Sequence, residues 1–382
     1  MSELVARARD LRDEIIAARP EMDRIRRLPD ALSRSLSNAQ LYRLCIPREQ
    51  DGLEAEPRVI VETLEALAEA DASAAWCAMI CSTTGAFGAY LPPEVSASIF
   101  RDPALVFAGV YAPMGKAVVE GDSYRVTGQW KWNSGGQNAT WLCGGCVIHE
   151  NGAPRMLTEK IPDHRMMLFP AHEATFVDTW HTSGLRGTGS GDMAVRDLLV
   201  PQSHSVSFVT DKPRIVSPLY AFPVFGLLAI GIAAVASGNA HAAVREFASL
   251  VSSKRAPGGR MLNERSTVQS AHAEAVARLG SARAFLFAEI EHAWKQAQGS
   301  SAIALEQRAS LRLAATHMTR TAAEVVRIVQ DLAGGAAVFS AEPLNRRLAD
   351  AQAMTAHIMI APATYELTGR ALLGVPVSAA EL

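Results

Sequence analysis

The stretch GQWKWNSGGQNATW, residues 128–141, predicts a strand, a tight glycine-rich turn and a second strand. Side chains alternate between the two faces of a strand, so Trp132 and Ser134 are expected to point the same way. A flat ring could then lie against the indole while the hydroxyl meets a heteroatom at the ring's edge. A core tryptophan beside an ordinary turn serine also explains the pattern, and both interpretations stay open.

Composition restricts the class of protein. The chain has 382 residues, 49% of them hydrophobic and 20% charged, which suits a globular protein with a large core and two or three structural units. Its net charge is −2, and no basic block indicates nucleic acid or an anionic membrane. The first twenty residues lack the apolar region of a signal peptide. Five cysteines in a chain of this size favour a reducing cytoplasm over a disulfide framework.

One segment resembles a membrane span in length and composition. Leu219 to Ala236 carries no charge. However, Pro223 interrupts it, small residues recur in it, and polar residues follow at once. We therefore expect a buried core helix.

The pattern of apolar residues changes twice along the chain. Residues 1–108 predict a helical domain, residues 109–211 a sheet of short strands separated by glycine turns, and residues 212–382 long helices. The last region is expected to form a four-helix bundle. The fold class is therefore α+β, with an antiparallel sheet between two helical domains.

Two glycine-containing motifs have ambiguous or weak meaning. The loop Gly184–Ser190 (GLRGTGS) resembles a phosphate-binding loop but lacks the context of a P-loop or a dinucleotide-binding fold. A plain connection between strands and a ligand contact are both open for it. Cys143 and Cys146 match C-x-x-C, yet on a strand their thiols would point to opposite faces, which argues against a redox or metal site.

His357 lies in an apolar stretch that predicts a helix. A single histidine there is often a core residue, but an imidazole is also the usual general base at neutral pH. Both roles stay open from the residues alone. The other histidines show no metal-binding spacing.

The order of the regions, together with Val126-Thr127-Gly128, Trp132-x-Ser134 and Gly135-Gly136, resembles the acyl-CoA dehydrogenase fold over nearly the whole chain. The resemblance implies that Trp132 lies against a flavin ring and that Ser134 bonds near its N5. It also implies cofactor contacts from Tyr111, from Arg255 toward a neighbouring subunit, and from Gly334 and Gly335 near the cofactor phosphates.

The departures from that family are informative. Ile358 stands where dehydrogenases of the fold often carry a catalytic glutamate, and isoleucine cannot abstract a proton. His357 instead resembles the histidine beside flavin and substrate in the flavin monooxygenase branch of the fold. Members of that branch often carry a second histidine some eight residues after a tryptophan like Trp76, where this chain has hydroxyl residues ending at Thr84. We therefore expect Trp76 and Thr84 near the substrate.

This resemblance implies an oxygenase component that receives reduced flavin, FMN or FAD, from a separate reductase. Oxygen would form a C4a-hydroperoxyflavin, steadied by Ser134, that hydroxylates an aromatic or heterocyclic small molecule with His357 orienting, deprotonating or protonating a reactant. The alternatives are an acyl-thioester dehydrogenase, an N-oxygenase of an amine, and a flavin-binding protein without turnover. A cytoplasmic homotetramer is expected, with no metal, nucleic acid or membrane partner.

Overall fold

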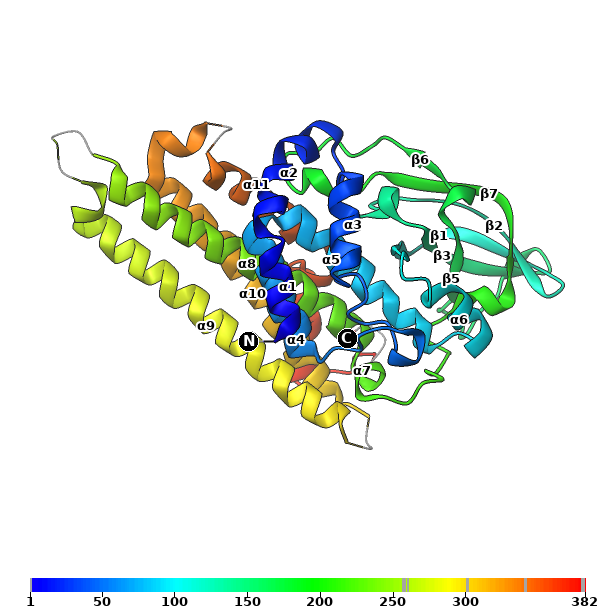
Figure 1. Ribbon diagram of the computed structural model, residues 1–382. Coiled ribbons are helices and arrows are strands. Elements are labelled where there is room, and N and C mark those ends of the chain that lie inside the picture. The colour runs from blue at the N-terminus through cyan, green and yellow to red at the C-terminus, as the bar shows by residue number, and fades with distance from the viewer. Residues whose placement is uncertain (1, 256–258, 260, 300–301, 340–341, 379–381) are drawn as a thin grey trace.

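The computed structural model describes residues 2–255, 259, 261–299, 302–339, 342–378 and 382. Long helices form one end of the molecule and a twisted sheet forms the other, with short N-terminal helices between them (Figure 1). This helix–sheet–helix order is the one that the sequence predicts.

The elements follow the chain in three groups. The N-terminal helices are α1 (Glu3–Asp10), α2 (Arg12–Ile25), α3 (Asp30–Asn38), α4 (Pro57–Ala70), α5 (Ala72–Thr84) and α6 (Pro93–Phe100). The strands are β1 (Phe107–Glu120), β2 (Ser123–Trp130), β3 (Trp141–Glu150), β4 (Ala153–Pro154), β5 (His164–Pro170), β6 (Thr175–Val177), β7 (Asp192–Pro201) and β8 (Ser205–Val206). The C-terminal helices are α7 (Pro218–Ala221), α8 (Val224–Ser253), α9 (Ser266–Ala297), α10 (Leu305–Ala333), α11 (Pro343–Thr355) and α12 (Ala363–Leu372). We propose domain boundaries near residues 108 and 211, where the element type changes.

The sheet is mixed rather than wholly antiparallel as predicted. Its order is β6-β7-β2-β1-β3-β5-β8, with β4 beside β3, and β1 pairs in parallel with β3. Because β2 and β3 flank β1 on opposite sides, residues 131–140 cross one end of β1, and the chain enters β3 in the direction of β1. This crossing carries Trp132 and Ser134.

Trp130, two residues before Trp132, is the core tryptophan of the sheet. It is fully buried, and its indole nitrogen donates to the carbonyl of Gly145 at 2.7 Å. A methyl group on Gly128 or Gly144 would lie 2.8 or 2.5 Å from the Trp130 ring. These glycines are therefore required by packing against the ring.

The two cysteines of the C-x-x-C match diverge, as the strand geometry predicts. Cys143 packs with Phe107 and Leu168 in a small cluster under α6, whereas Cys146 belongs to the main core. Burial raises the pKa of both thiols, so both stay protonated at neutral pH.

Helix α8 is the described helix that is long and apolar enough to span a membrane, and 83% of its apolar window is buried inside the protein. It packs against α4, α5, α10 and α11, in agreement with the predicted core helix. Its backbone approaches α4 so closely that a methyl group on Gly238 would lie 2.3 Å from the carbonyl oxygen of Glu65.

We expect Gly238→Ala to lower the free energy of unfolding by about 1–3 kcal/mol, because α8 and α4 must move apart. The control is Gly280→Ala in α9, where no atom lies within 4 Å of the added methyl group. Replacing this helical glycine by alanine should raise the free energy of unfolding by about 0.5–1 kcal/mol. Thermal unfolding of both variants measures the difference, and equal melting temperatures would contradict the described contact.

Candidate functional site

Helix α5 carries Trp76 and is held at its first turn by a buried carboxylate. The side chain of Asp71 accepts hydrogen bonds from the backbone nitrogens of Ser73 and Ala74, which caps the helix. The other oxygen of Asp71 accepts from Arg346 of α11 at 2.9 Å, and Arg346 also pairs with Asp23 of α2 at 2.6 Å. These ion pairs join α2, α5 and α11 behind Trp76.

The crossing segment that carries Ser134 is a turn, so the predicted strand geometry was wrong there. Strand β2 ends at Trp130, and Trp132 has a left-handed backbone with φ of 64°. As a result, the side chain of Ser134 is buried, while Trp132 is 61% exposed. The turn is fixed by backbone bonds from Asn133 to the carbonyl of Gly191 and from Gly135 to the carbonyl of Thr188, at 3.0 and 2.9 Å.

The Gly184–Ser190 loop, whose role the sequence leaves open, packs directly against this turn. A methyl group on Gly184 would lie 2.0 Å from the carbonyl oxygen of Ala349 in α11, so the loop and α11 are in backbone contact. Leu185 has a left-handed backbone with φ of 51°, and its nitrogen donates to the carboxylate of Asp350 at 2.6 Å. The loop is therefore a structural support for the turn.

A line of hydrogen bonds joins α5, the turn and the loop. The indole nitrogen of Trp76 lies 3.1 Å from the hydroxyl of Ser134, which lies 2.7 Å from the hydroxyl of Ser190. Ser190 lies 2.6 Å from the hydroxyl of Thr188, which bonds to the carbonyl of Leu185 at 2.8 Å. Every side chain in this line except Trp76 comes from a loop, and Trp76 comes from the rigid α5.

His357 completes the cluster from the other side of Trp76. The two rings meet edge to face, with centroids 5.7 Å apart. The predicted helix is wrong at this point: α11 ends at Thr355, and His357 caps a short turn over Ile358–Ile360. Its Nδ1 accepts the backbone N–H of Met359 at 3.2 Å.

The state of His357 follows from these contacts. Burial and the nearby positive charge of Arg312 lower the pKa of His357 to about 4. The imidazole is therefore neutral at pH 7, and because Nδ1 accepts a hydrogen bond, the hydrogen sits on Nε2. Arg312 also holds the turn, since it donates to the carbonyl of Met359 at 3.0 Å. His357 thus presents a hydrogen-bond donor, and its Nδ1 is occupied.

Comparisons with known proteins agree on one family. Residues 230–362 match the model of the acyl-CoA dehydrogenase C-terminal domain. The chain is 32% identical to indole-3-acetate monooxygenase of Pseudomonas putida over 93% of this chain and 89% of that one. It is 30% identical to a protein of the same name from Acinetobacter baumannii, over 98% and 94% of the two chains. XiaF from a Streptomyces species, solved with FADH2 and glycerol, shares the fold with a TM-score of 0.92 at 24% identity, over 98% and 96% of the chains.

The chain belongs to the flavin-dependent monooxygenases of the acyl-CoA dehydrogenase fold. A flavin-dependent hydroxylase named as an oxygenase component, the resorcinol hydroxylase of a Rhizobium species, is 26% identical over 97% of the chain. An oxygenase component works with a separate reductase and a small-molecule substrate.

The remaining predicted residues of the monooxygenase lie outside the Trp76–Ser134–His357 cluster. The hydroxyl of Thr84, two turns along α5 from Trp76, bonds to the carbonyl of Ile80 in its own helix. Tyr111 lies in β1 among aromatic rings, 4.9 Å from Phe225 and stacked 6.0 Å from Phe208 between centroids. Burial raises the pKa of Tyr111 to about 12, so its hydroxyl stays protonated.

Arg255, Gly334 and Gly335 lie at the other end of the bundle. Lys254, next to Arg255, donates to the carbonyl of Ala333 at 2.9 Å, which places the end of α8 beside the glycine turn after α10. Gly334 has φ of 62° and caps α10. Both helix ends lie on the side of the bundle farthest from the sheet (Figure 1), so these residues are separated from Ser134 within one chain.

The residues that hold Ser134 and His357 in place carry no clear signal in the sequence. Ser190 and Thr188 were visible only as hydroxyls in an ambiguous loop, and Arg312 was one of many arginines on a helix. No spacing rule links them to Ser134 or His357, because they come from segments 45 or more residues away in the chain. The density of glycine and hydroxyl residues at 184–190 is the one signal that points to the loop.

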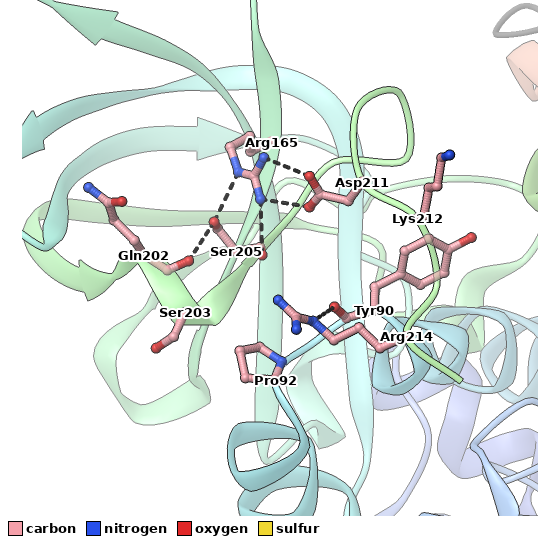
Figure 2. A pocket seen from close by; sticks show the side chains of 9 residues that line it. All are labelled: Tyr90, Pro92, Arg165, Gln202, Ser203, Ser205, Asp211, Lys212 and Arg214. Atoms are coloured by element: carbon pink, nitrogen blue, oxygen red, sulfur yellow. Dashed lines mark hydrogen bonds and ion pairs between the residues drawn. The ribbon is translucent and has the colours of Figure 1, made fainter. Parts of the chain in front are cut away.

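A separate polar pocket of about 300 Å³ lies at the edge of the sheet (Figure 2). In it, Arg165 forms a two-pronged ion pair with Asp211, and Arg214 donates to the carbonyl of Tyr90. None of the residues predicted for the flavin or the substrate lines this pocket.

The lowered pKa of His357 gives a prediction for pH. Between about pH 6.5 and 4 the unfolded chain takes up a proton that the folded monooxygenase does not, so His357 makes the protein less stable as the pH falls through this range. His357→Gln should lack this loss of stability at low pH. At pH 5 we expect the wild type to lose more free energy of unfolding than the variant, by on the order of 1 kcal/mol, or roughly 2 °C in melting temperature. Melting temperatures of both proteins at pH 7.5 and 5 test it. An identical loss in the two proteins would show that His357 titrates normally.

Proposed function

We propose that this monooxygenase hydroxylates an aromatic or heterocyclic small molecule, using oxygen and reduced FMN or FAD delivered by a separate reductase. The observation that carries the proposal is the Trp76–Ser134–His357 cluster, in which one indole donates to a hydroxyl oxygen and meets an imidazole ring edge to face. Relatives named for action on indole-3-acetate and on resorcinol support an aromatic substrate.

The residues present fit a flavin. The exposed indole of Trp132 stands on a left-handed backbone at the end of the sheet, and it makes no ring contact with another aromatic side chain among the described residues. Ser134 keeps one lone pair without a partner in the described chain. Between them, both polar atoms of the buried Asn133 side chain also lack hydrogen-bond partners in that part of the protein. A polar-edged flat ring would satisfy such groups.

We assign the residues as follows. Trp132, Ser134 and Tyr111 contact the flavin ring, while Gly334, Gly335 and Arg255 contact the distal part of a flavin in a neighbouring subunit. When bound, the reduced flavin supplies the electrons that activate oxygen for transfer to the substrate. Ser134 accepts a hydrogen bond at the ring's edge, and the apolar surroundings of Trp76 exclude water from the reacting atoms.

His357 acts by donation in this proposal. Because its pKa is lowered to about 4 and its Nδ1 is occupied, it is a weak proton acceptor at pH 7. Its Nε2–H is available to orient a phenol oxygen or another acceptor on the substrate. Trp76 and Thr84 line the substrate side, and Thr84 would take part through a lone pair, since its hydrogen bonds to its own helix.

Dehydrogenation of an acyl thioester lacks support. Ile358, where a catalytic glutamate would stand, is 80% exposed on the turn after His357. Oxygen transfer to an amine nitrogen would use the same cluster and is one outcome of the substrate screen described next.

The test supplies the protein with a flavin reductase, NADH, oxygen and a panel of phenols, indoles and aromatic amines, and identifies products by mass spectrometry with ¹⁸O₂. We expect a hydroxylated aromatic product that carries one ¹⁸O atom. An N-oxide as the sole product would replace aromatic hydroxylation by amine oxidation. No oxygenated product from any compound in the panel would contradict the proposal.

Ser134→Ala should uncouple the reaction. We expect the yield of product per flavin oxidised to fall about tenfold, with a matching rise in hydrogen peroxide, because one hydrogen bond at the ring's edge is lost. Ser203→Ala, in the separate surface pocket, is the matched control and should behave as wild type. If Ser134→Ala yields as much product per flavin oxidised as the wild type, Ser134 does not act on the flavin.

We further propose a cytoplasmic homotetramer. Exposed apolar side chains lie on the C-terminal helices and directly after α12, among them Val276, Leu372 and Leu373, and all five cysteines are buried as free thiols. Light scattering should give four times the monomer mass. In mixed tetramers, Arg255→Ala and Ser134→Ala subunits should restore part of the activity that each homotetramer loses, because each flavin site would draw on two subunits. A monomer, or no restoration on mixing, would contradict the shared site.

A further inference from the structure

We propose that the hydrogen-bond line from Trp76 to Leu185 holds Ser134 as an acceptor and thereby makes the site prefer reduced over oxidised flavin. Thr188 and Ser190 are then positioning residues that set this preference without touching the cofactor. The inference rests on the proposed flavin site and adds to it the origin of its selectivity for one redox state.

The direction of the line follows from counting hydrogens. Four contacts connect Trp76, Ser134, Ser190, Thr188 and the carbonyl of Leu185, at 3.1, 2.7, 2.6 and 2.8 Å. Four hydrogens are available, one on the indole nitrogen and one on each hydroxyl. The indole can only donate and the carbonyl can only accept. One arrangement alone fills all four contacts: Trp76 donates to Ser134, Ser134 to Ser190, Ser190 to Thr188, and Thr188 to Leu185.

This arrangement leaves Ser134 without a hydrogen for a ligand. Its hydrogen is directed at Ser190, one lone pair receives the Trp76 N–H, and the second lone pair has no partner among the described residues. Ser134 is 6% exposed, so water replaces these partners poorly. The hydroxyl is therefore fixed as an acceptor.

The two redox states of a flavin differ at N5, the ring atom that the proposed site places beside Ser134. Reduced flavin carries hydrogen on N5 and can donate it, whereas N5 of oxidised flavin carries only a lone pair. Ser134 held as an acceptor pairs with the reduced form and faces the oxidised form lone pair to lone pair. An oxygenase that receives flavin already reduced gains from this bias, because spent oxidised flavin leaves the site more readily.

Both ends of the line are fixed by the fold. Trp76 is rigidly placed on α5, whose first turn is capped by Asp71. Leu185 has a left-handed backbone, which sets the direction of its carbonyl, and its own backbone nitrogen donates to Asp350 at 2.6 Å. The same carbonyl also accepts the indole N–H of Trp180 at 3.0 Å, so it is held from two directions.

The test compares Thr188→Val with Thr188→Ser. Valine removes the acceptor of the Ser190 hydrogen, which can then turn to Ser134 and release the Ser134 hydrogen toward the ligand. Serine keeps the whole line. Ser190→Ala releases the Ser134 hydrogen by a second route. Dissociation constants of reduced and oxidised FMN and FAD are measured anaerobically by quenching of tryptophan fluorescence, together with the midpoint potential of the bound flavin.

We expect wild type and Thr188→Ser to bind reduced flavin at least about tenfold more tightly than oxidised flavin. In Thr188→Val and Ser190→Ala the ratio should fall about tenfold, mainly through tighter binding of oxidised flavin, and the potential should fall by about 30 mV. Circular dichroism and melting temperature identify a variant that has lost the fold. If Thr188→Val does not fold, the binding ratio and the potential of Ser190→Ala decide the test.

Unchanged ratios and potentials in folded Thr188→Val and Ser190→Ala would overturn the inference. If wild type binds flavin and forms product while these ratios stay unchanged, only the role of the line is wrong. If wild type binds flavin in neither redox state, the proposed function fails, and this inference fails with it.

Discussion

The hydrogen bond from Trp76 to Ser134 connects the helical and sheet parts of this protein at the point where the candidate chemistry lies. It joins a rigid helix, α5, to a turn that crosses one end of β1. A buried polar atom that loses its partner costs about 1–3 kcal/mol, so the turn and the helix are held in one relative position. The position of Ser134, the direction of its hydroxyl and the edge-to-face contact with His357 all depend on this indole.

The indole is in turn positioned by buried charge. Arg346 contacts Asp71 and Asp23 at 2.9 and 2.6 Å, and Asp350 lies 4.0 Å away while binding the Gly184–Ser190 loop. Burial raises the pKa of Asp350, and the charge of Arg346 opposes that effect. Removing one partner from such a group leaves an uncompensated buried charge, which is costly. Helices α2, α5 and α11 and the loop therefore form one unit behind the site.

The site contains few groups that exchange protons near pH 7. His357 is held neutral by burial and by Arg312, and the buried thiols have raised pKa values. What the cluster offers is directed hydrogen bonding in an apolar environment, where such bonds are strong. This arrangement suits a protein whose cofactor supplies the difficult chemistry and whose side chains set orientation and water exclusion.

Much of this protein was predictable from its sequence, because the signals are local. The helix–sheet–helix order follows from apolar periodicity. The buried core helix follows from the uncharged segment Leu219–Ala236, most of which lies in α8. Motifs within a few residues of one another indicated the fold family, and the missing glutamate at Ile358 indicated the monooxygenase branch.

Only the tertiary structure decided how those residues are oriented. Trp132 and Ser134 were expected on one face, but a left-handed residue in a crossing turn separates them, because side-chain alternation holds only while the backbone stays extended. The parallel pairing of β1 with β3 depends on which side of β1 the chain crosses to. The partners of Ser134 and the protonation of His357 come from distant segments, whose proximity no local pattern encodes. The sequence by itself determined which groups are present, and the packing of distant segments determined which of them donate, which accept and which stay neutral.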